Sequence, residues 1–505
     1  MTRRRLGSVF WQLSLAGMLT GAALPVSAQV LAAPEGPAAA RVPVQADTLP
    51  GLWRLGRNAA GLAAAGPAAP SRLGLRADAR AGALRRVQAP ARTGGGRVET
   101  EGQRAFGGEV VARGVFAFGR RAEAGRRWGN TANPTGRSPY VWADSAGGDW
   151  LRDGLAAEVA VALPSPGAGI RPGLRADYAA EQGARRDDPR PLFRRRALML
   201  APGLARRLGG GLSAGLVAEA AFEREENEVG FFAGDDPLVF RLRGLGTFDQ
   251  TALVRAQRAT VGRTLGATAQ LAGEAGRTRW AVAAGGAAHA AETRDGVATP
   301  AFGGSVRGRA AHARAALRQA GARGGAEAAL DVRADRLRGT DPVFRAVNTV
   351  DERAHAEVAL AHWRGAASPA GARAALGLKV GAERLVRRDV ATQTRWAVTA
   401  LAARADARSL LPGGFDTSGR LIARAPLAAA YAADRPTTLT PVLVRPDFDL
   451  HAAPSLDAEL GLGAVRTLRS GRAVRVALRG GTAAGWPAGR FATRPFLLLS
   501  LDLFG

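Results

Sequence analysis

Hydrophobic and polar residues alternate with a period of two over much of the chain. In RLGLRADAR, Leu73 and Leu75 share one parity with two alanines, and the charged residues take the other. The same alternation recurs at 170–181, 211–223, 327–335, 372–383 and 455–466. Strict alternation predicts strands that have one apolar face and one polar face.

Two other structures compete with a membrane barrel as explanations of these segments: helices and a soluble β-sandwich. Helix competes because Ala, Leu and Arg are good helix formers, but the charges scatter around a helical wheel and glycines such as Gly215 and Gly377 interrupt the segments. A soluble β-sandwich would need bulky residues for a dense core, and many apolar positions here are alanine. We therefore predict an all-β fold, a transmembrane antiparallel up-and-down β-barrel of about 16–20 strands, with an even number typical.

The last segment, RPFLLLSLDLFG (494–505), fits a closing barrel strand. Four leucines at 497, 499, 501 and 503 would face lipid, while Ser500 and Asp502 would face the lumen. Barrels of this class commonly end in an aromatic residue on the hydrophobic parity, whereas Phe504 is on the other parity and Gly505 follows it. We still expect the barrel assembly machinery to bind this strand.

The N-terminal region predicts a signal peptide followed by an arm or plug. Three arginines, an apolar stretch and the small residues Val26-Ser27-Ala28 predict a signal peptide over 1–28, cleaved after Ala28. Residues 29–68 are rich in Ala, Pro and Gly and predict a periplasmic arm or a lumenal plug, with a short helix at 52–62. The barrel then occupies 69–505, and the predicted location is the outer membrane.

Connections between the predicted strands differ in length. Short ones include 206–211, 273–278, 319–325, 364–371 and 469–471, and long ones are 224–250 and 338–351. Such alternation is typical of periplasmic turns and external loops. Trp280, Trp363 and Trp396 fall at predicted strand ends, where an interfacial aromatic girdle would lie.

Composition narrows the functional classes. The absence of cysteine excludes disulfides, thiolate metal sites and cysteine nucleophiles. A formal net charge of +27 has two interpretations: arginine is used heavily throughout the chain, which its even distribution favours, or the charge serves an anion-binding surface or lumen, or affinity for outer-membrane lipid, lipopolysaccharide or nucleic acid. The arginines are spread along the chain instead of being clustered on one element, which argues against nucleic acid as a partner.

Charged residues on the polar parity are the candidate lumen-facing set. The set comprises Arg171, Arg175, Asp177, Glu181, Glu219, Glu223, Glu327, Asp331, Arg333, Asp335, Lys379, Glu383, Asp457 and Glu459. Mixed charges of this kind can brace a barrel or line a conduction path with anion preference. Both interpretations stay open.

Catalytic, cofactor and metal sites are not indicated. The five histidines lack metal-ligand spacing, and His355 and His362 fall on opposite parities of one strand. Asp144, Asp149 and Asp153 could bind Ca²⁺, although capping of backbone amides is the commoner role for such residues. The acidic run EREENE (223–228) reads as a solvated external loop.

Three stretches carry a family resemblance. LWRLGRNAAGL (52–62), SPYVWADSAGGDW (138–150) and DDPRP (187–191) occur in an order that resembles a family of bacterial outer-membrane β-barrel proteins of unknown function. The resemblance covers most of the chain after residue 28. It implies a barrel fold and an outer-membrane location, and it implies no activity.

The expected function is therefore that of a barrel and not of an enzyme. The leading hypothesis is a porin-like or gated channel that passes small polar or anionic solutes. The alternative is a binding or structural barrel, such as an adhesin or an envelope assembly partner. A barrel hydrolase is the third hypothesis, but Ser213 and Ser305 have no histidine motif beside them.

Overall fold

The computed structural model describes residues 51–64, 71–107, 110–165, 169–230, 239–251, 255–296, 298–366, 372–469 and 472–504. The predicted signal peptide lies outside these residues, as does most of the predicted arm. Within the described residues, no helix is long and apolar enough to cross a membrane.

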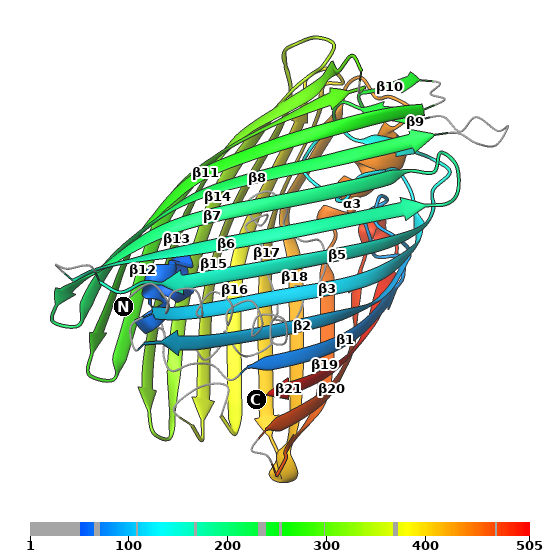
Figure 1. The fold of residues 1–505 in the computed structure, drawn as a ribbon. Helices are drawn as coiled ribbons and strands as arrows, with labels where there is room; N and C mark the ends of the chain where they lie inside the picture. The colour runs from blue at the N-terminus through cyan, green and yellow to red at the C-terminus, as the bar shows by residue number, and fades with distance from the viewer. Residues whose placement is uncertain are drawn as a thin grey trace.

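Eighteen strands of the described residues form one closed antiparallel barrel (Figure 1). Each strand pairs with its neighbours in chain order, and β1 closes the ring by pairing with β21, with Leu75 opposite Leu501. The barrel strands are β1 (Arg72–Ala81), β2 (Arg92–Phe106), β3 (Val110–Arg126), β5 (Gly148–Ala162), β6 (Ile170–Arg185), β7 (Leu192–Gly209), β8 (Leu212–Gly230), β11 (Arg255–Ala275), β12 (Thr278–Asp295), β13 (Ala301–Gly321), β14 (Gly324–Thr340), β15 (Val347–Arg364), β16 (Ala374–Asp389), β17 (Thr394–Leu410), β18 (Phe415–Ala433), β19 (Ser455–Thr467), β20 (Ala473–Gly485) and β21 (Ala492–Phe504). The predicted transmembrane barrel is confirmed, and its strand number lies within the predicted range.

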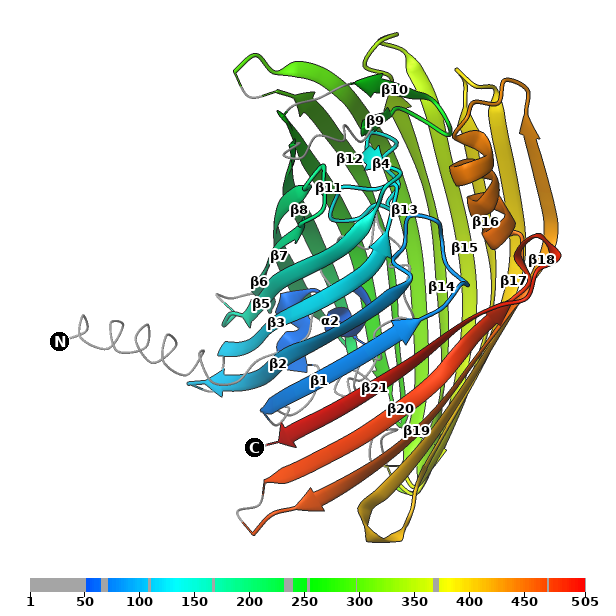
Figure 2. The same ribbon diagram turned by 90° about the vertical axis from the view of Figure 1, so that its right-hand side faces the viewer.

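Short elements lie between or inside the barrel strands. A second, three-stranded sheet contains β4 (Trp142–Asp144), β9 (Val239–Leu242) and β10 (Phe248–Thr251). The helical elements are α2 (Leu52–Gly56), η3 (Ala59–Ala64), η4 (Pro412–Gly414), η5 (Thr440–Val444), α3 (Arg445–His451) and η6 (Pro487–Gly489). Figure 2 shows α2 inside the ring of strands.

The two faces of the barrel wall differ as the alternation predicts. On β21, Leu497, Leu499 and Leu501 are 52%, 48% and 40% exposed on the outside, while Asp502 on the inside is fully buried. Most inward side chains of the wall are charged or small, and the bulky inward residues, such as Trp363 and Trp396, are buried. An apolar outer band with a polar interior is the pattern of a barrel that spans a membrane.

The two ends of the barrel are unequal. The start of β1 and the end of β21 lie side by side, at the end of the barrel that has the shorter turns (Figure 1). The opposite end carries the long connections 127–147 and 434–454. We call it the long-loop end.

Two predicted loops are wrong in extent. Residues 338–351 are mostly strand, because β14 runs to Thr340 and β15 begins at Val347. The acidic run 223–228 belongs to β8, which continues to Gly230. These strand ends carry polar residues on both faces, so the alternation of hydrophobic and polar positions that marks a strand is lost there.

Candidate functional site

The lumen of the barrel is the candidate site, and all the predicted lumen-facing residues lie on the inner parity of their strands. They fall into two environments. Arg175 and Asp177 on β6 are 3% and 1% exposed, whereas the side chains of Lys379 and Glu383 on β16 are 37% and 47% exposed. A segment of the chain that folds inward covers the first pair.

This inner segment, residues 51–64, lies on a bed of glycines from β6, β7 and β8. A Cβ atom at Gly173 would overlap the backbone of the segment, and one at Gly203 would overlap the side chain of Asn58. Asn58 Nδ2 in turn donates to the carbonyl oxygens of Leu204 and Leu216, at 3.0 and 3.3 Å. The glycines therefore allow a close approach that any side chain would prevent.

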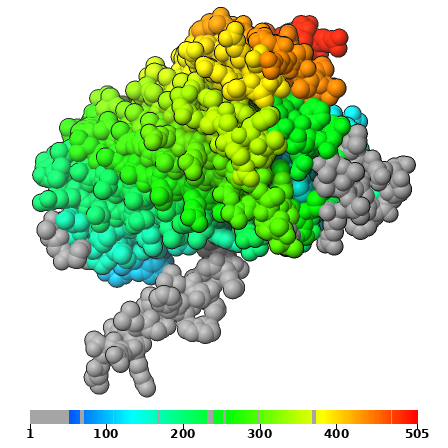
Figure 3. Space-filling view, turned by 90° about the horizontal axis from the view of Figure 1, so that it is seen from above, coloured from blue at the N-terminus to red at the C-terminus, as the bar shows by residue number. Residues whose placement is uncertain are grey.

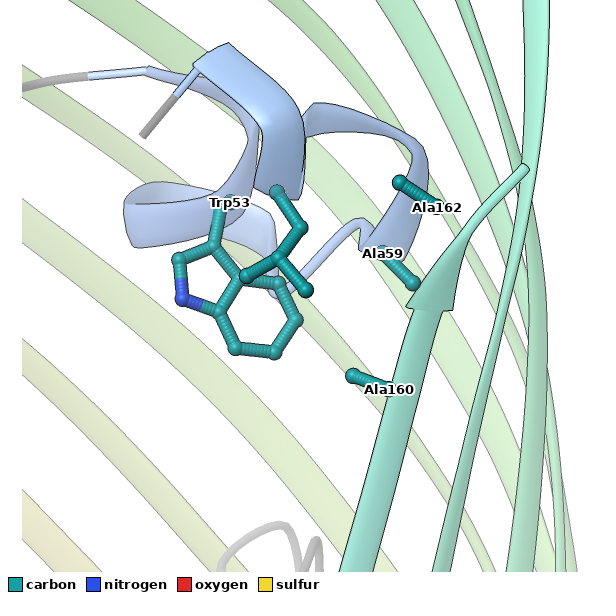
Figure 4. Close-up of a cluster of buried hydrophobic side chains, with 5 residues drawn as sticks. Trp53, Ala59, Ala160 and Ala162 are labelled. Atoms are coloured by element: carbon teal, nitrogen blue, oxygen red, sulfur yellow. The ribbon is translucent and has the colours of Figure 1, made fainter. Parts of the chain in front are cut away.

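Apolar packing fixes the inner segment on β5. Figure 4 shows Trp53 and Ala59 of the segment beside Ala160 and Ala162 of the strand. These residues and Leu62 form one buried cluster in which Trp53 is 5% exposed. Two alanines on the strand leave room for the indole ring, so the contact depends on complementary shape.

Ion pairs tie the inner segment to distant parts of the wall. Arg57 pairs with Glu158 on β5, and Arg54 pairs with Glu327 on β14. Glu158 also accepts a hydrogen bond of 2.6 Å from Arg113 on β3. The segment therefore reaches from β5 to β14 across the intervening inner wall.

A second set of residues folds into the long-loop end. We define the loop cap as residues 127–147, 239–251 and 434–454. Its apolar centre packs Leu439 against Val141, Phe240 and Leu242, which come from all three stretches. Figure 3 shows the molecule from above, where yellow and orange residues from the later part of the chain lie beside green residues from its middle.

Alternating arginine and aspartate side chains anchor the loop cap to the barrel wall. Asp447 of α3 binds Arg86 at 2.5 Å and Arg387 of β16 at 3.0 Å. Arg387 also binds Asp351 of β15 at 2.7 Å, and Asp351 accepts a hydrogen bond of 2.8 Å from Arg137 of the cap. Burial alone would raise the pKa of Asp447, but Arg86 and Arg387 outweigh this effect and hold the pKa below its usual range.

A hydrogen-bonded group completes the anchoring of the loop cap. Arg243 binds Asp341 at 2.7 Å, and Asn348 Nδ2 donates to the carbonyl oxygen of Arg243 at 2.6 Å. The hydroxyl of Tyr140 donates to Asn348 Oδ1 at 3.2 Å. Burial, with the nearby charge of Asp341, raises the pKa of Tyr140, so this hydroxyl remains a donor.

The helix α3, which belongs to the loop cap, packs aromatic side chains against the barrel wall. The ring of His451 stacks on Trp396 of β17 with a centroid separation of 5.6 Å, and Phe448 meets the same indole edge-on at 6.0 Å. Burial lowers the pKa of His451 to about 4, although Asp447 opposes this shift. His451 is thus neutral at neutral pH.

The predicted tryptophan girdle is wrong for two of its three members. Trp363 and Trp396 are 1% and 2% exposed on the inner face. Trp363 packs over Gly325 and under Arg318, and Trp396 holds α3. A shift of one position would place each side chain on the outer face. The pattern near a strand end does not show which of the two faces a residue takes. Trp280 faces outward, above Gly273.

The acidic candidates form structural contacts in place of a cation site. Asp144 accepts from the backbone amide of Gly147 at 2.8 Å, and Asp149 accepts from Gly125 at 2.9 Å. Asp153 faces outward and pairs with Arg120 at 2.9 Å. Within the described part of the chain, no three His, Cys, Asp or Glu side chains converge as metal ligands.

Sequence reasoning did not identify the residues that anchor the loop cap, among them Arg137, Arg387 and Asp447. They lie in loops or at strand ends where alternation fails. The motif 138–150 was an available signal, since Tyr140, Trp142 and Asp144 are all buried in the folded cap.

Several solved structures resemble the fold at low similarity. The OccK9 (OpdG) structure of Pseudomonas aeruginosa is 12% identical, with 87% of this chain and 98% of that chain covered and a TM-score of 0.36. The OpdK structure with vanillate, from the same organism, is 12% identical over 86% and 99%, with a TM-score of 0.34. BauA, the ferric preacinetobactin receptor of Acinetobacter baumannii, is 9% identical over 86% and 80%, at 0.38. We draw no inference from likenesses this distant.

Sequence comparison gives a clearer result. No curated protein matches this chain. A family model matches residues 59–501, which include η3 of the inner segment, the loop cap and nearly all of the barrel. The resemblance expected from the three motifs is confirmed. The chain belongs to the family of unknown function DUF6850.

Proposed function

We propose that this protein is an outer-membrane channel for small polar solutes, with anions preferred, and that the loop cap is its gate. The observation that carries the proposal is the uncovered inner wall opposite the inner segment. Arg333, Lys379 and Glu383 keep 45%, 37% and 47% of their side-chain surface exposed while facing inward. Charged side chains with this much accessible surface favour a water-filled path.

The charges along this path are paired across strands. Lys379 Nζ lies 2.6 Å from Glu357, and Arg420 lies 2.9 Å from Glu459. Paired charges offer a polar solute exchangeable hydrogen-bond partners without binding it tightly. The preference for anions rests on the net charge of the whole chain, +27, to which outward arginines also contribute.

In this proposal, the signal peptide is cleaved after Ala28 and directs the chain through the inner membrane. The closing strand β21 is the signal for the barrel assembly machinery. The long-loop end faces outward, as is usual for such barrels. The loop cap then lies on the external side of the path, where it can respond to conditions outside the cell.

Planar-bilayer recording of the refolded mature protein tests the proposal. We expect discrete openings, and a reversal potential under a salt gradient that shows anion preference. A folded protein that shows no openings at any voltage would contradict the proposal that this protein is a channel. It would favour a binding or structural barrel.

A further inference from the structure

We propose that an arginine cluster on the outer surface of the barrel binds the phosphates of lipid A. Arg307 and Arg309 on β13 lie directly opposite Arg338 and Arg336 on β14. All four side chains are exposed on the outward parity. Like charges directly opposite each other destabilise a sheet. Glu352 supplies a carboxylate to Arg336, so the other three arginines, Arg307, Arg309 and Arg338, call for an anion from outside the protein.

The same cross-strand row carries further positive charge. It runs from Arg263 on β11 through Ala290, Arg307, Arg338 and Val350 to Arg388 on β16. No acidic residue occurs in this row. In the neighbouring row Arg336 does have a partner, Glu352, at 3.0 Å. The excess charge is therefore local to a few adjacent strands.

The cluster lies at the upper edge of the apolar band. Outward positions on β14 are apolar from Ala326 to Ala334, and Arg336 and Arg338 follow. Eight residues of tilted strand span roughly 20 Å along the membrane normal, close to the apolar height of an outer-membrane barrel. The arginines thus meet the lipid headgroups of the leaflet at the long-loop end.

A groove lies at the cluster and extends from it toward the long-loop end. It has a volume of about 1480 Å³, and Val261, Phe302 and Glu292 line it together with the four arginines of the cluster. A phosphorylated sugar headgroup fits this groove, and its acyl chains would lie on the other side of the arginines, against the apolar outward positions of β14. Arginine is suited to the phosphate because its guanidinium group can bind two oxygens at once.

Charge complementarity favours lipid A over a phospholipid. A phosphomonoester carries about −1.5 to −2 at neutral pH. Two such groups on one disaccharide balance the three arginines of the cluster that do not pair with Glu352, whereas a phosphodiester lipid brings a single negative charge. The leaflet at the long-loop end is also the one that contains lipid A when that end faces outward.

The test measures lipid binding to the refolded mature protein in an uncharged detergent by native mass spectrometry. The probes are bisphosphorylated lipid A, dephosphorylated lipid A and phosphatidylglycerol. The key variant is Arg307→Gln/Arg338→Gln. The matched control is Arg206→Gln/Arg466→Gln, which removes the same charge from outward positions at the opposite end. Heat-modifiable mobility on gels reports that each variant has folded.

We expect bisphosphorylated lipid A to bind most tightly and the key variant to bind it at least about tenfold more weakly, the size expected for losing one charge-assisted hydrogen bond. The control should bind like the unaltered protein. Equal binding of phosphatidylglycerol, or unchanged binding by the key variant, would overturn the assignment. Conductance is not part of this test, so its result is independent of the channel proposal.

Discussion

The inner segment and the loop cap both fold into the barrel, but different forces hold them. The inner segment rests on Gly173 and Gly203 and packs Trp53 against alanines, so shape dominates. The loop cap is held mainly by the chain of charges around Asp447 and Asp351. Shape complementarity is insensitive to pH, whereas an arrangement of buried charges responds to it. This difference is why we assign the gate to the cap.

The largest expected effect comes from Asp447→Asn. It removes the Asp447 carboxylate that Arg86 binds and one of the two carboxylates that Arg387 binds. Breaking a buried ion pair from one side costs about 3–5 kcal/mol, so the cap should detach while the barrel stays folded. Single-channel recording should show a large rise in open probability.

Asp449→Asn is the matched control for that variant. Asp449 is in the same helix but pairs with the exposed Arg445, a contact worth about 0.3–0.5 kcal/mol. Its openings should resemble those of the unaltered protein. Equal effects of the two variants would mean that the charge network does not hold the cap.

Gly173→Ala tests whether close packing on glycine holds the inner segment. The added Cβ meets backbone of the inner segment, which cannot rotate away, and such overpacking costs about 1–3 kcal/mol. We expect a larger single-channel conductance because the segment leaves its bed, with little change in open probability. Gly377→Ala, on the uncovered wall where a Cβ makes ordinary contacts, should leave conductance unchanged.

Acid should open the cap by a smaller amount. The folded-state pKa of His451, about 4, lies below its ordinary value of 6.5. The neutral ring is therefore favoured in the docked cap, so docking is strongest above pH 6.5 and weakens as the pH falls toward 4. Between pH 7 and 5.5 the loss amounts to about 1 kcal/mol.

Open probability measured across this pH range checks the expectation. The charged groups facing His451 are Asp447, Arg86, Arg387 and Arg424. Because the pKa of Asp447 is lowered, that carboxylate stays ionised throughout the range. His451→Gln should flatten the response, and an unchanged acid response in this variant would exclude His451 as its source.

The smallest expected effect is on selectivity. Lys379→Gln removes a cation from the uncovered wall and leaves Glu357 without its partner. The reversal potential should shift toward cations while open probability stays the same. Arg206→Gln removes the same charge from the outer face, and it should produce no shift.

The barrel could be predicted from sequence because each membrane strand repeats a period of two. Leu497 to Leu503 identified the closing strand without reference to any other part of the chain. The site was harder to predict, because Arg387 meets Asp447 only through folding of a loop sixty residues away. The opposed arginines on β13 and β14 were hidden for a related reason, since their pairing depends on strand register, which the pattern of one strand does not contain.

We propose that two separately held segments, the inner segment and the loop cap, restrict one path through the barrel. Single-channel recording of the unaltered protein, Asp447→Asn, Gly173→Ala and the double variant tests it most directly. We expect more frequent openings for Asp447→Asn, larger openings for Gly173→Ala, and both changes together in the double variant. A folded double variant that remains closed would contradict it.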